Sequence, residues 1–365
     1  MFWCTQAILQ TFAPNRWFIM FENKETTNID ELGEFRLIKH LTDAISLETD
    51  QTLIGAGDDA ALVNPKGKMA IVSTDLLIEQ VHFDMMYTPL KHLGYKAAVV
   101  NFSDICAMNG QPSQLTLSIA FSSKYTLEAI EELYSGALLA CKKYEVDLIG
   151  GDTSTIPNGL VISGTAMGFI DENEVVKRSG AKTGDLLCVT GDLGGAYMGL
   201  QLLEREKRVF LEQKDMQPDL KNHDYIVGRQ LKPEARIDVI DFLKKAGITP
   251  TSMIDISDGL SSEIFHLSES SQVDFTIYEE KLPIDQDTFN MAVEFGIDAT
   301  TAALNGGEDY ELLFTIKQED YEKIKNDPDI TVIGHAKDKG MKNELHSKQG
   351  NTYALQAQGW KHKNE

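Results

Sequence analysis

The sequence is poor in cysteine and has no recognised zinc motif. Its four cysteines, Cys4, Cys106, Cys141 and Cys188, are scattered without a C-x-x-C pair, and its eight histidines form no H-E-x-x-H motif. Dispersed cysteines are typical of a reduced compartment and argue against a disulfide framework. We therefore expect a cytoplasmic protein without a cysteine-based zinc centre.

Long hydrophobic runs are also missing. No stretch reaches the ~18 apolar residues that a membrane-spanning helix needs. Residues Met1–Met20 come nearest, but Pro14, Asn15 and Arg16 interrupt them. A targeting segment is one interpretation. The ordinary composition after Met20 favours the other, an extension upstream of the true start. We predict an extension over residues 1–30 and no membrane association.

The common nucleotide-binding motifs do not occur. The chain has no G-x-x-x-x-G-K-[ST] loop and no H-R-D or D-F-G motif. Residues Gly55–Ala60 match G-x-G-x-x-A, but Asp58 and Asp59 stand where a pyrophosphate would approach, and Asn64-Pro65 follow soon after. These features argue against a dinucleotide site.

Basic residues are outnumbered by acidic ones, 34 to 56, which gives a formal net charge of −22. Such a surface repels the phosphate backbone of nucleic acids and anionic membranes, so we expect neither as a partner. Part of the acidic excess can instead serve as metal ligands.

The chain has 365 residues, 42% of them hydrophobic, which is enough for two domains with cores of their own. Apolar runs of strand length alternate with helical patterns in both halves, and a turn at Asp171–Asn173 separates the halves. We predict an N-terminal α/β domain over residues 31–170 and a C-terminal α+β domain over residues 171–365.

The individual elements follow from hydrophobic periodicity and capping signals. Thr126 is predicted to cap a helix, and residues 204–232 are predicted to form a long charged excursion. Predicted strands cover residues 69–73, 115–121, 146–149, 160–170, 186–189, 253–255, 275–277, 312–316 and 330–333, and predicted helices cover residues 33–45, 95–104, 236–246, 259–267 and 319–325, with another beginning at 195.

Five acidic motifs are expected at strand ends or in glycine-rich turns. Carboxylates that share one rim repel one another, so either their pKa values rise or cations neutralise them. Oxygen ligands without cysteine or paired histidine favour Mg²⁺, with Ca²⁺ and Mn²⁺ as alternatives, and clustered Mg²⁺ is typical of phosphate chemistry. The motifs are Gly57-Asp58-Asp59, Ser73-Thr74-Asp75, Asn101-Phe102-Ser103-Asp104, Gly150-Gly151-Asp152-Thr153 and Asp255-Ile256-Ser257-Asp258-Gly259.

A basic loop and a second acidic turn accompany these motifs. In Lys177–Asp185, Arg178 could pair bidentately with a nucleotide phosphate, although an exposed basic turn is an equally ordinary interpretation. Gly306–Phe314 is an acidic turn that leads into a strand. His82 and Trp360, each taken alone, are more often structural than functional.

Read in chain order, these motifs resemble the thiamine-monophosphate kinase family, from the superfamily that includes aminoimidazole ribonucleotide synthetase and selenophosphate synthetase. The resemblance extends from about Gly33 to Trp360. The residues that carry it are Gly33-Glu34-Phe35, Gly57–Ala61, Ser73–Asp75, His82-Phe83, Asn101–Gly110, Gly150–Thr153, Arg178–Ala181, Asp255–Leu260 and Gly307–Leu312.

The resemblance implies a two-domain fold like that of aminoimidazole ribonucleotide synthetase, with the N-terminal domain forming a homodimer. It implies direct transfer of the ATP γ-phosphoryl group to thiamine monophosphate, with several Mg²⁺ ions and no covalent nucleophile. It also implies roles for individual residues: Asp59, Ser73, Thr74, Asp75, Asp104, Asp152, Asp255 and Asp258 at the metal, Gly151, Asp152, Arg178 and Ser257 at ATP, and His82, Glu308 and Trp360 at thiamine monophosphate.

Two alternatives stay open at this point. One is another ATP-dependent enzyme of the superfamily. Selenophosphate synthetase would need a reactive cysteine in a glycine-rich N-terminal loop, and a hydrogenase-maturation relative would need a C-terminal cysteine, whereas this sequence ends His362-Lys363-Asn364-Glu365. The other alternative is a catalytically inactive protein that binds Mg²⁺ or nucleotide.

Overall fold

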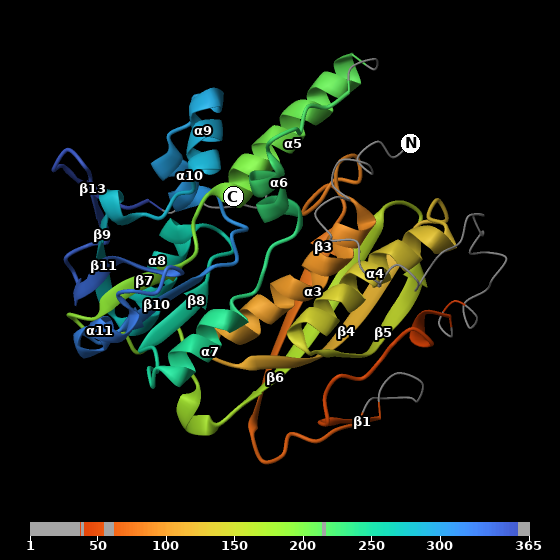
Figure 1. Cartoon of the computed structure of the whole chain (residues 1–365), viewed down its shortest axis with the longest axis horizontal. Coiled ribbons are helices and arrows are strands. Elements are labelled where there is room, and N and C mark those ends of the chain that lie inside the picture. The colour runs from red at the N-terminus through yellow and green to blue at the C-terminus, as the bar shows by residue number, and fades with distance from the viewer. Residues whose placement is uncertain (1–36, 38–39, 55–61, 214–216, 357–365) are drawn as a thin grey trace. The chain divides into compact units, whose positions relative to one another are not determined.

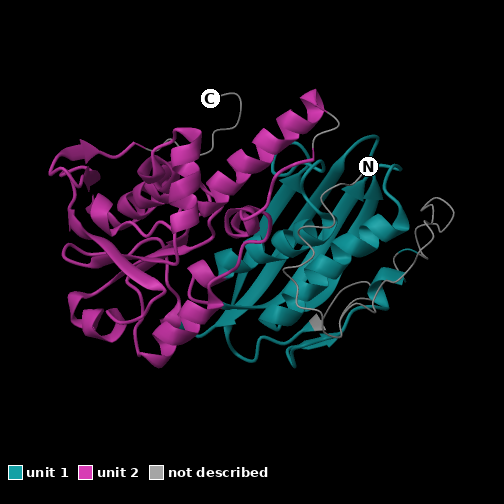
Figure 2. Ribbon diagram, turned by 45° about the horizontal axis from the view of Figure 1, so that its top comes forward, with its two compact units in different colours: residues 1–105, 111–172 teal, residues 106–110, 173–365 magenta. Residues whose placement is uncertain are grey.

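The computed structural model describes residues 37, 40–54, 62–213 and 217–356. These residues fall into two compact units (Figure 2). Unit 1 extends to Ile105 and resumes over residues 111–172, and unit 2 takes residues 106–110 and everything from Asn173 onward. The predicted extension over residues 1–30, the Gly57-Asp58-Asp59 motif and Trp360 lie outside the described residues.

Unit 1 is built on a four-stranded sheet in the order β3-β6-β4-β5, in which β4 and β5 are parallel and the other neighbours antiparallel. The long strands alternate buried and more exposed residues, which is the pattern of a sheet covered on one face. The strands of this unit are β1 (Thr52–Ile54), β2 (Leu62–Val63), β3 (Met69–Ile78), β4 (Gln111–Phe121), β5 (Asp147–Thr155) and β6 (Leu160–Ile170), and β1 and β2 pair separately.

Two 18-residue helices, α3 (Leu90–Ala107) and α4 (Leu127–Tyr144), accompany this sheet (Figure 1). The predicted cap of α4 is confirmed, because the Thr126 side chain accepts a hydrogen bond from the Ala129 amide. The helices cross at two glycines: a Cβ on Gly94 would lie 1.8 Å from the Leu133 carbonyl oxygen, and one on Gly136 would lie 1.8 Å from that of Lys91. Only glycine permits so close an approach.

Unit 2 contains a seven-stranded sheet in the order β13-β12-β9-β11-β7-β10-β8. All neighbouring strands are antiparallel except β12 and β9. Strand β10, which lies between β7 and the edge strand β8, is buried along its whole length, as expected for a continuous apolar run. The strands are β7 (Leu186–Thr190), β8 (Ser252–Asp255), β9 (Val273–Tyr278), β10 (Leu312–Ile316), β11 (Ile330–Asp338), β12 (Glu344–His346) and β13 (Thr352–Ala354).

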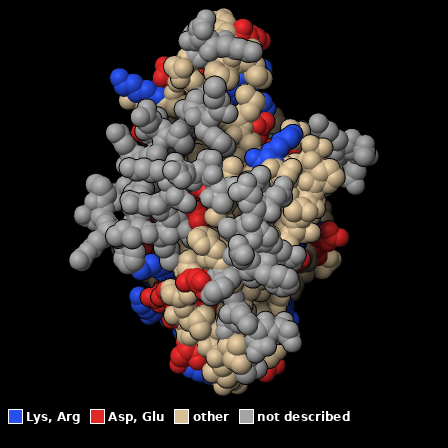
Figure 3. Space-filling model, turned by 90° about the vertical axis from the view of Figure 1, so that its right-hand side faces the viewer, with Lys and Arg blue, Asp and Glu red and all other residues tan. Residues whose placement is uncertain are grey.

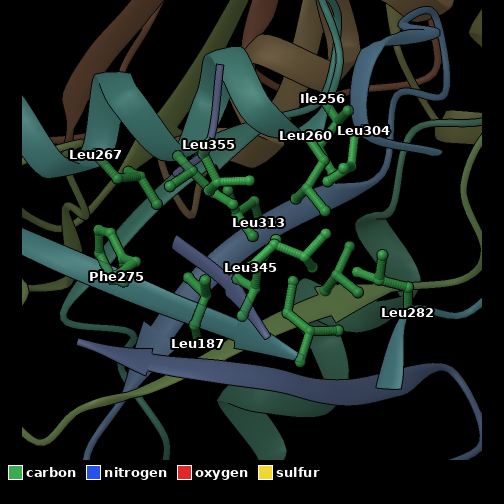
Figure 4. Close-up of a cluster of buried hydrophobic side chains, with 14 of the residues drawn as sticks. Leu187, Ile256, Leu260, Leu267, Phe275, Leu282, Leu304, Leu313, Leu345 and Leu355 are labelled. Carbon is green, nitrogen blue, oxygen red and sulfur yellow. The ribbon is translucent and has the colours of Figure 1, made fainter. Parts of the chain in front are cut away.

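The core of unit 2 lies between this sheet and the helix α8 (Figure 4). Leu260 and Leu267 of α8 are fully buried against Phe275 of β9 and Leu313 of β10. The helices of this unit are α5 (Gly195–Glu212), α6 (Asp224–Leu231), α7 (Ile237–Lys245), α8 (Leu260–Ser271), α9 (Gln286–Phe295), α10 (Ala299–Asn305) and α11 (Tyr321–Ile324), and short 3₁₀ turns occupy Glu172–Glu174, Glu279–Lys281 and Gln318–Asp320. No helix among the described residues is long and apolar enough to cross a bilayer.

The structure corrects two sequence predictions. The predicted excursion over residues 204–232 is largely helical, because α5 continues to Glu212 and α6 begins at Asp224. The acidic motifs at Asp75 and Asp152 do not stand at strand ends, since β3 continues to Ile78 and β5 to Thr155. Asp255, in contrast, does end its strand as predicted.

Candidate active site

In unit 1, three of the predicted metal ligands come together. Ser73 Oγ on β3 donates a hydrogen bond of 2.5 Å to Asp104 Oδ2 on α3, and the Asp75 amide donates to Asn101 Oδ1 at 3.1 Å. Burial and, to a smaller extent, the negative charge of Asp104 raise the pKa of Asp75 to about 6. Two carboxylates that disfavour each other's charge form a site suited to a cation.

Asn101 explains how β3 and α3 come so close. Its side-chain amide donates to the Ala97 carbonyl at 2.9 Å, and a Cβ on Gly164 of β6 would lie only 2.4 Å from the same nitrogen. The glycine therefore makes room for an asparagine that holds the Asp75 backbone. Asn101 belongs to a predicted motif, but the motif predicted no role for it.

Thr74 and Asp152 point to the opposite face of this sheet. Side chains alternate along a strand, so Thr74 faces away from Asp75. The strand pairing places Asp152 in the same cross-strand row as Leu76, on the exposed face where Leu76 is 49% and Val72 60% exposed. The expectation that all these acids share one rim is therefore wrong within unit 1, because a strand presents successive residues to two faces.

His82 lies in the turn that follows β3. The Ile78 amide donates to His82 Nδ1 at 3.0 Å, which leaves Nε2 to carry the proton of the neutral ring. The imidazole is partly buried. The residue therefore closes the end of β3 and can also present an N–H group.

In unit 2, the segment Asp255–Gly259 forms a tight loop between β8 and α8. The amide of Asp258 donates to Glu263 Oε1 at 3.1 Å, and Glu263 is only 2% exposed. Burial raises the pKa of Glu263 to about 7, against the lowering effects of the Asp258 and Ser257 amides and of the positive charge of Arg178. The loop thus keeps Asp258 exposed while Glu263 holds its backbone.

Glu263 was not predicted as a site residue. An acid five residues after Asp258, in the first turn of a helix, is also an ordinary helix-dipole partner. Only the hydrogen bond that Glu263 accepts from the Asp258 amide distinguishes a residue that supports the site from an ordinary helix-dipole partner.

A second loop, residues 306–311, packs against the first. The Glu308 amide donates to the Ser257 carbonyl at 2.7 Å, and a Cβ on Gly307 would lie 2.6 Å from the same oxygen. Glu308 and Tyr310 both adopt positive φ, 59° and 53°, which is uncommon for non-glycine residues and costs backbone energy. The Glu308 carboxylate accepts from Gln230 Nε2 of α6 at 2.8 Å. The structure therefore brings Glu308, which is predicted to contact thiamine monophosphate, next to Ser257, which is predicted to contact ATP.

The remaining acids of this turn have a different environment. Glu311 accepts from Arg229 Nη1 at 2.9 Å and from Arg236 Nη1 at 2.8 Å, and Asp309 accepts from the Gly194 amide at 2.9 Å. Burial raises the pKa of Asp309 to about 7, while Arg229 and backbone amides lower it. The start of α5 is thus capped by the protein's own carboxylate, and these two acids have their cations within the fold.

Arg178 lies in an exposed loop before β7. The carbonyl of the preceding Lys177 accepts from the Met253 amide at 3.0 Å, so the loop is anchored to β8. The guanidinium is therefore carried by a fixed backbone and is open to a ligand.

No complete metal centre forms among the described residues, since no three Asp, Glu, His or Cys side chains converge closely enough to hold an ion. The predicted ligands are divided between unit 1 and unit 2, and Asp59 lies outside the described residues. On the face drawn in Figure 3, the described acidic side chains are interspersed with basic ones.

Comparison with known proteins gives the family. The domain family described as "AIR synthase related protein, N-terminal domain" matches residues 57–170. Over 340 residues, the chain is 35% identical to the thiamine-monophosphate kinase of Bacillus subtilis (strain 168), covering 91% of this chain and 99% of that protein. The chain belongs to the thiamine-monophosphate kinase family.

Solved structures of thiamine-monophosphate kinases share the fold over nearly the same length. AaThiL complexed with AMPPCP and TMP aligns with a TM-score of 0.69 and 33% identity, covering 92% of this chain and 99% of that one. The enzyme from Stenotrophomonas maltophilia K279a aligns with a TM-score of 0.70 and 28% identity, covering 90% and 98%. The family resemblance and the two-domain fold inferred from the sequence are therefore confirmed, and the individual site residues stay predictions.

Proposed function

We propose that the chain transfers the γ-phosphoryl group of ATP to the phosphate of thiamine monophosphate, with thiamine diphosphate and ADP as products. The observation that carries this proposal is its likeness, over almost the whole chain, to AaThiL complexed with AMPPCP, an ATP analogue, and TMP. The motifs that carried the sequence resemblance are distributed over both units of the structure.

Both reactants carry phosphate groups, so their negative charges oppose the reaction. Positioning and charge neutralisation then contribute most to catalysis, and no covalent nucleophile is needed. On the nucleotide side we assign Arg178 and Ser257 of unit 2, with Gly151 and Asp152 of unit 1. The exposed Arg178 can form a bidentate contact with phosphate oxygens.

We assign the thiamine monophosphate side to His82, Glu308 and Trp360. The His82 N–H group can donate to a phosphate oxygen. The thiazolium ring is a cation, which suits the negative charge of Glu308 and the π-face of Trp360. Gln230 and the strained 306–311 loop hold Glu308 in place, which supports a role that needs a fixed carboxylate.

Divalent magnesium is the metal that the donors fit. Ser73, Asp75 and Asp104 offer only oxygen atoms, and both burial and the charge of Asp104 raise the pKa of Asp75, so a cation bound there would favour its charged form. We also assign Asp59, Thr74, Asp152, Asp255 and Asp258 to the ions, with Thr74 and Asp152 at a different ion from Asp75 because they lie on the other face of the sheet. Bound there, Mg²⁺ would neutralise the charge that develops on the transferred phosphoryl group.

We also propose a homodimer formed through unit 1, in the cytoplasm. The face of the sheet that bears Leu76 and Val72 exposes large apolar side chains. A second copy of the same face would bury them, as an isologous interface requires. Sedimentation should show a dimer, and Val72→Glu should shift it toward monomer, whereas a monomeric wild type would contradict this proposal.

The deciding experiment measures ADP release and the thiamine product with ATP, Mg²⁺ and thiamine monophosphate. Thiamine and an aminoimidazole precursor serve as control substrates. We expect one ADP for each thiamine diphosphate and no reaction with the controls. Turnover with a control alone would indicate another enzyme of the superfamily. Nucleotide binding without turnover would indicate an inactive binding protein.

A further inference from the structure

Ser271, the last residue of α8, makes three hydrogen bonds to the loop that carries Arg178. Its hydroxyl accepts from the Gly180 amide at 3.1 Å and from the Ala181 amide at 3.2 Å, and it donates to the Arg178 carbonyl at 3.0 Å. A hydroxyl has one donor and two acceptor positions, so the loop uses all of them.

The other side of the same loop is equally constrained. Gly180 has a φ of +131°, and a Cβ there would lie 2.3 Å from the Thr251 carbonyl oxygen at the entrance to β8. Together with the bond between Lys177 and Met253, this encloses the loop between β8 and the end of α8. The backbone of Arg178 therefore has little freedom while Ser271 is in place.

Helix α8 is a rigid support for this contact. Leu260, Ile264 and Leu267 on its inner face are fully buried in the core of unit 2 (Figure 4 labels Leu260 and Leu267). The charge of Arg178 acts on Glu263, eight residues before Ser271, which corresponds to about 12 Å along a helix. The loop that carries Arg178 is thus held at the C-terminal end of the helix whose first turn contains Glu263.

We propose that Ser271 is a positioning residue, which fixes the loop backbone so that the guanidinium of Arg178 faces the phosphates of ATP. This inference rests on the proposed function, because that function places Arg178 at the nucleotide. Ser271 touches no reactant itself and acts through Arg178. Removing its hydroxyl leaves three backbone groups without their partner and lets the loop move.

The test compares Ser271→Ala with Ser270→Ala, a matched change at the exposed neighbouring position of the same helix. Calorimetric binding of AMPPCP with Mg²⁺ should weaken about tenfold in Ser271→Ala, the size expected for one lost hydrogen-bonding group. The KM for ATP should rise by a similar factor, while kcat and the KM for thiamine monophosphate stay within twofold of wild type. Ser270→Ala should match wild type, and Ser271→Thr, which keeps the hydroxyl, should recover most of the affinity.

A double-mutant cycle tests whether Ser271 acts through Arg178. In the Arg178→Ala background, Ser271→Ala should change AMPPCP affinity less than twofold, because the group being positioned is gone. Equal tenfold losses in both backgrounds, or a silent Ser271→Ala, would overturn the inference. If Ser271→Ala weakens both substrates equally and melts early, its role is structural and the inference also fails.

Failure of the proposed function gives a different pattern. Wild type would then bind AMPPCP but form no thiamine diphosphate. Ser271→Ala would still bind AMPPCP more weakly than wild type, Ser270→Ala and Ser271→Thr. Normal turnover in wild type with unchanged binding in Ser271→Ala would refute only the role of Ser271.

Discussion

Two acidic motifs that look alike in the sequence have opposite environments in the fold. Asp75 of unit 1 is partly buried, and the causes that shift its pKa, burial and the charge of Asp104, both raise it. Glu311 of unit 2 is 2% exposed and bonds two guanidinium groups, those of Arg229 and Arg236. Glu311 is therefore compensated by cations within the protein, whereas we propose that Asp75 binds a cation supplied from outside.

This difference separates structural acids from functional ones. A buried carboxylate with bonded arginines contributes to a single native arrangement, and removing it takes one buried partner from each arginine. A carboxylate close to another carboxylate lowers the stability of the folded state, and such pairs are concentrated at binding and catalytic sites. The acidity of a motif alone therefore does not identify a metal site, whereas its counter-charges do.

The largest expected effect is on turnover in Asp75→Asn. If Asp75 holds Mg²⁺, the neutral amide should reduce kcat by a factor of at least about a thousand, comparable to removing a key electrostatic group. The exposed Asp50, which pairs with Lys66, gives the control, since Asp50→Asn should leave the rate unchanged. Retained activity per folded molecule, combined with early melting, would make Asp75 a structural residue.

The opposite behaviour is expected for Glu311→Ala. Loss of this carboxylate removes one partner from each of Arg229 and Arg236, and should lower the free energy of unfolding by about 1.5–3 kcal/mol, the size of a lost hydrogen bond to a charged group. Urea denaturation measures this directly. Glu319 forms a surface pair with Lys317, so Glu319→Ala should change stability by less than about 0.5 kcal/mol. Equal losses of unfolding free energy in Glu311→Ala and Glu319→Ala would show that the arginine contacts of Glu311 do not stabilise the fold.

The pH dependence of stability should also distinguish Asp75. Its pKa is raised from 3.8 to about 6 in the folded state, so the folded protein binds the proton more readily than the unfolded chain does. The charged form therefore costs stability above about pH 6, and the cost disappears as the pH falls toward the unfolded pKa near 4. In metal-free buffer, Asp75→Asn should exceed wild type by about 3 kcal/mol at pH 8 and match it near pH 4. A difference that stays constant with pH would contradict the assigned cause.

The smallest expected effect concerns arginines with different environments. Arg178 is exposed, whereas Arg229 is bonded to Glu311 inside the fold. Arg178→Lys keeps the charge but loses the planar fork, so kcat/KM for ATP should fall by about ten- to a hundredfold without loss of stability. Binding of thiamine monophosphate should barely change. A silent variant, or one that weakens thiamine monophosphate instead, would reverse the proposed placement of the substrates.

Much of the fold is predictable because apolar runs and caps act locally. The run Leu312–Ile316 forms a strand buried on both faces, and the Thr126 cap forms as expected. The end of β3 was mispredicted because the apolar run stops at Ser73, while pairing with β6 carries the strand on to Ile78. Pairing between distant strands is not visible in a local pattern.

The site was less predictable, for a related reason. Arg229 and Glu311 are 82 positions apart, and only the fold brings them together. Likewise, Ser271 lies 93 positions from Arg178, and no motif marks it. Sequence motifs gave the chemical types present, and the tertiary contacts decide which acids are free to take a metal and which residues support them.

The most direct test of this account is the effect of Mg²⁺ on unfolding at pH 8, measured in wild type and in Asp75→Asn. A ligand that binds only the folded state stabilises it by mass action, so millimolar Mg²⁺ should raise the unfolding free energy of wild type by about 1–3 kcal/mol. The same addition should leave Asp75→Asn nearly unchanged, so that the stability advantage of the variant in metal-free buffer is lost. If Mg²⁺ stabilises both proteins equally, or neither, Asp75 does not bind the cation as proposed.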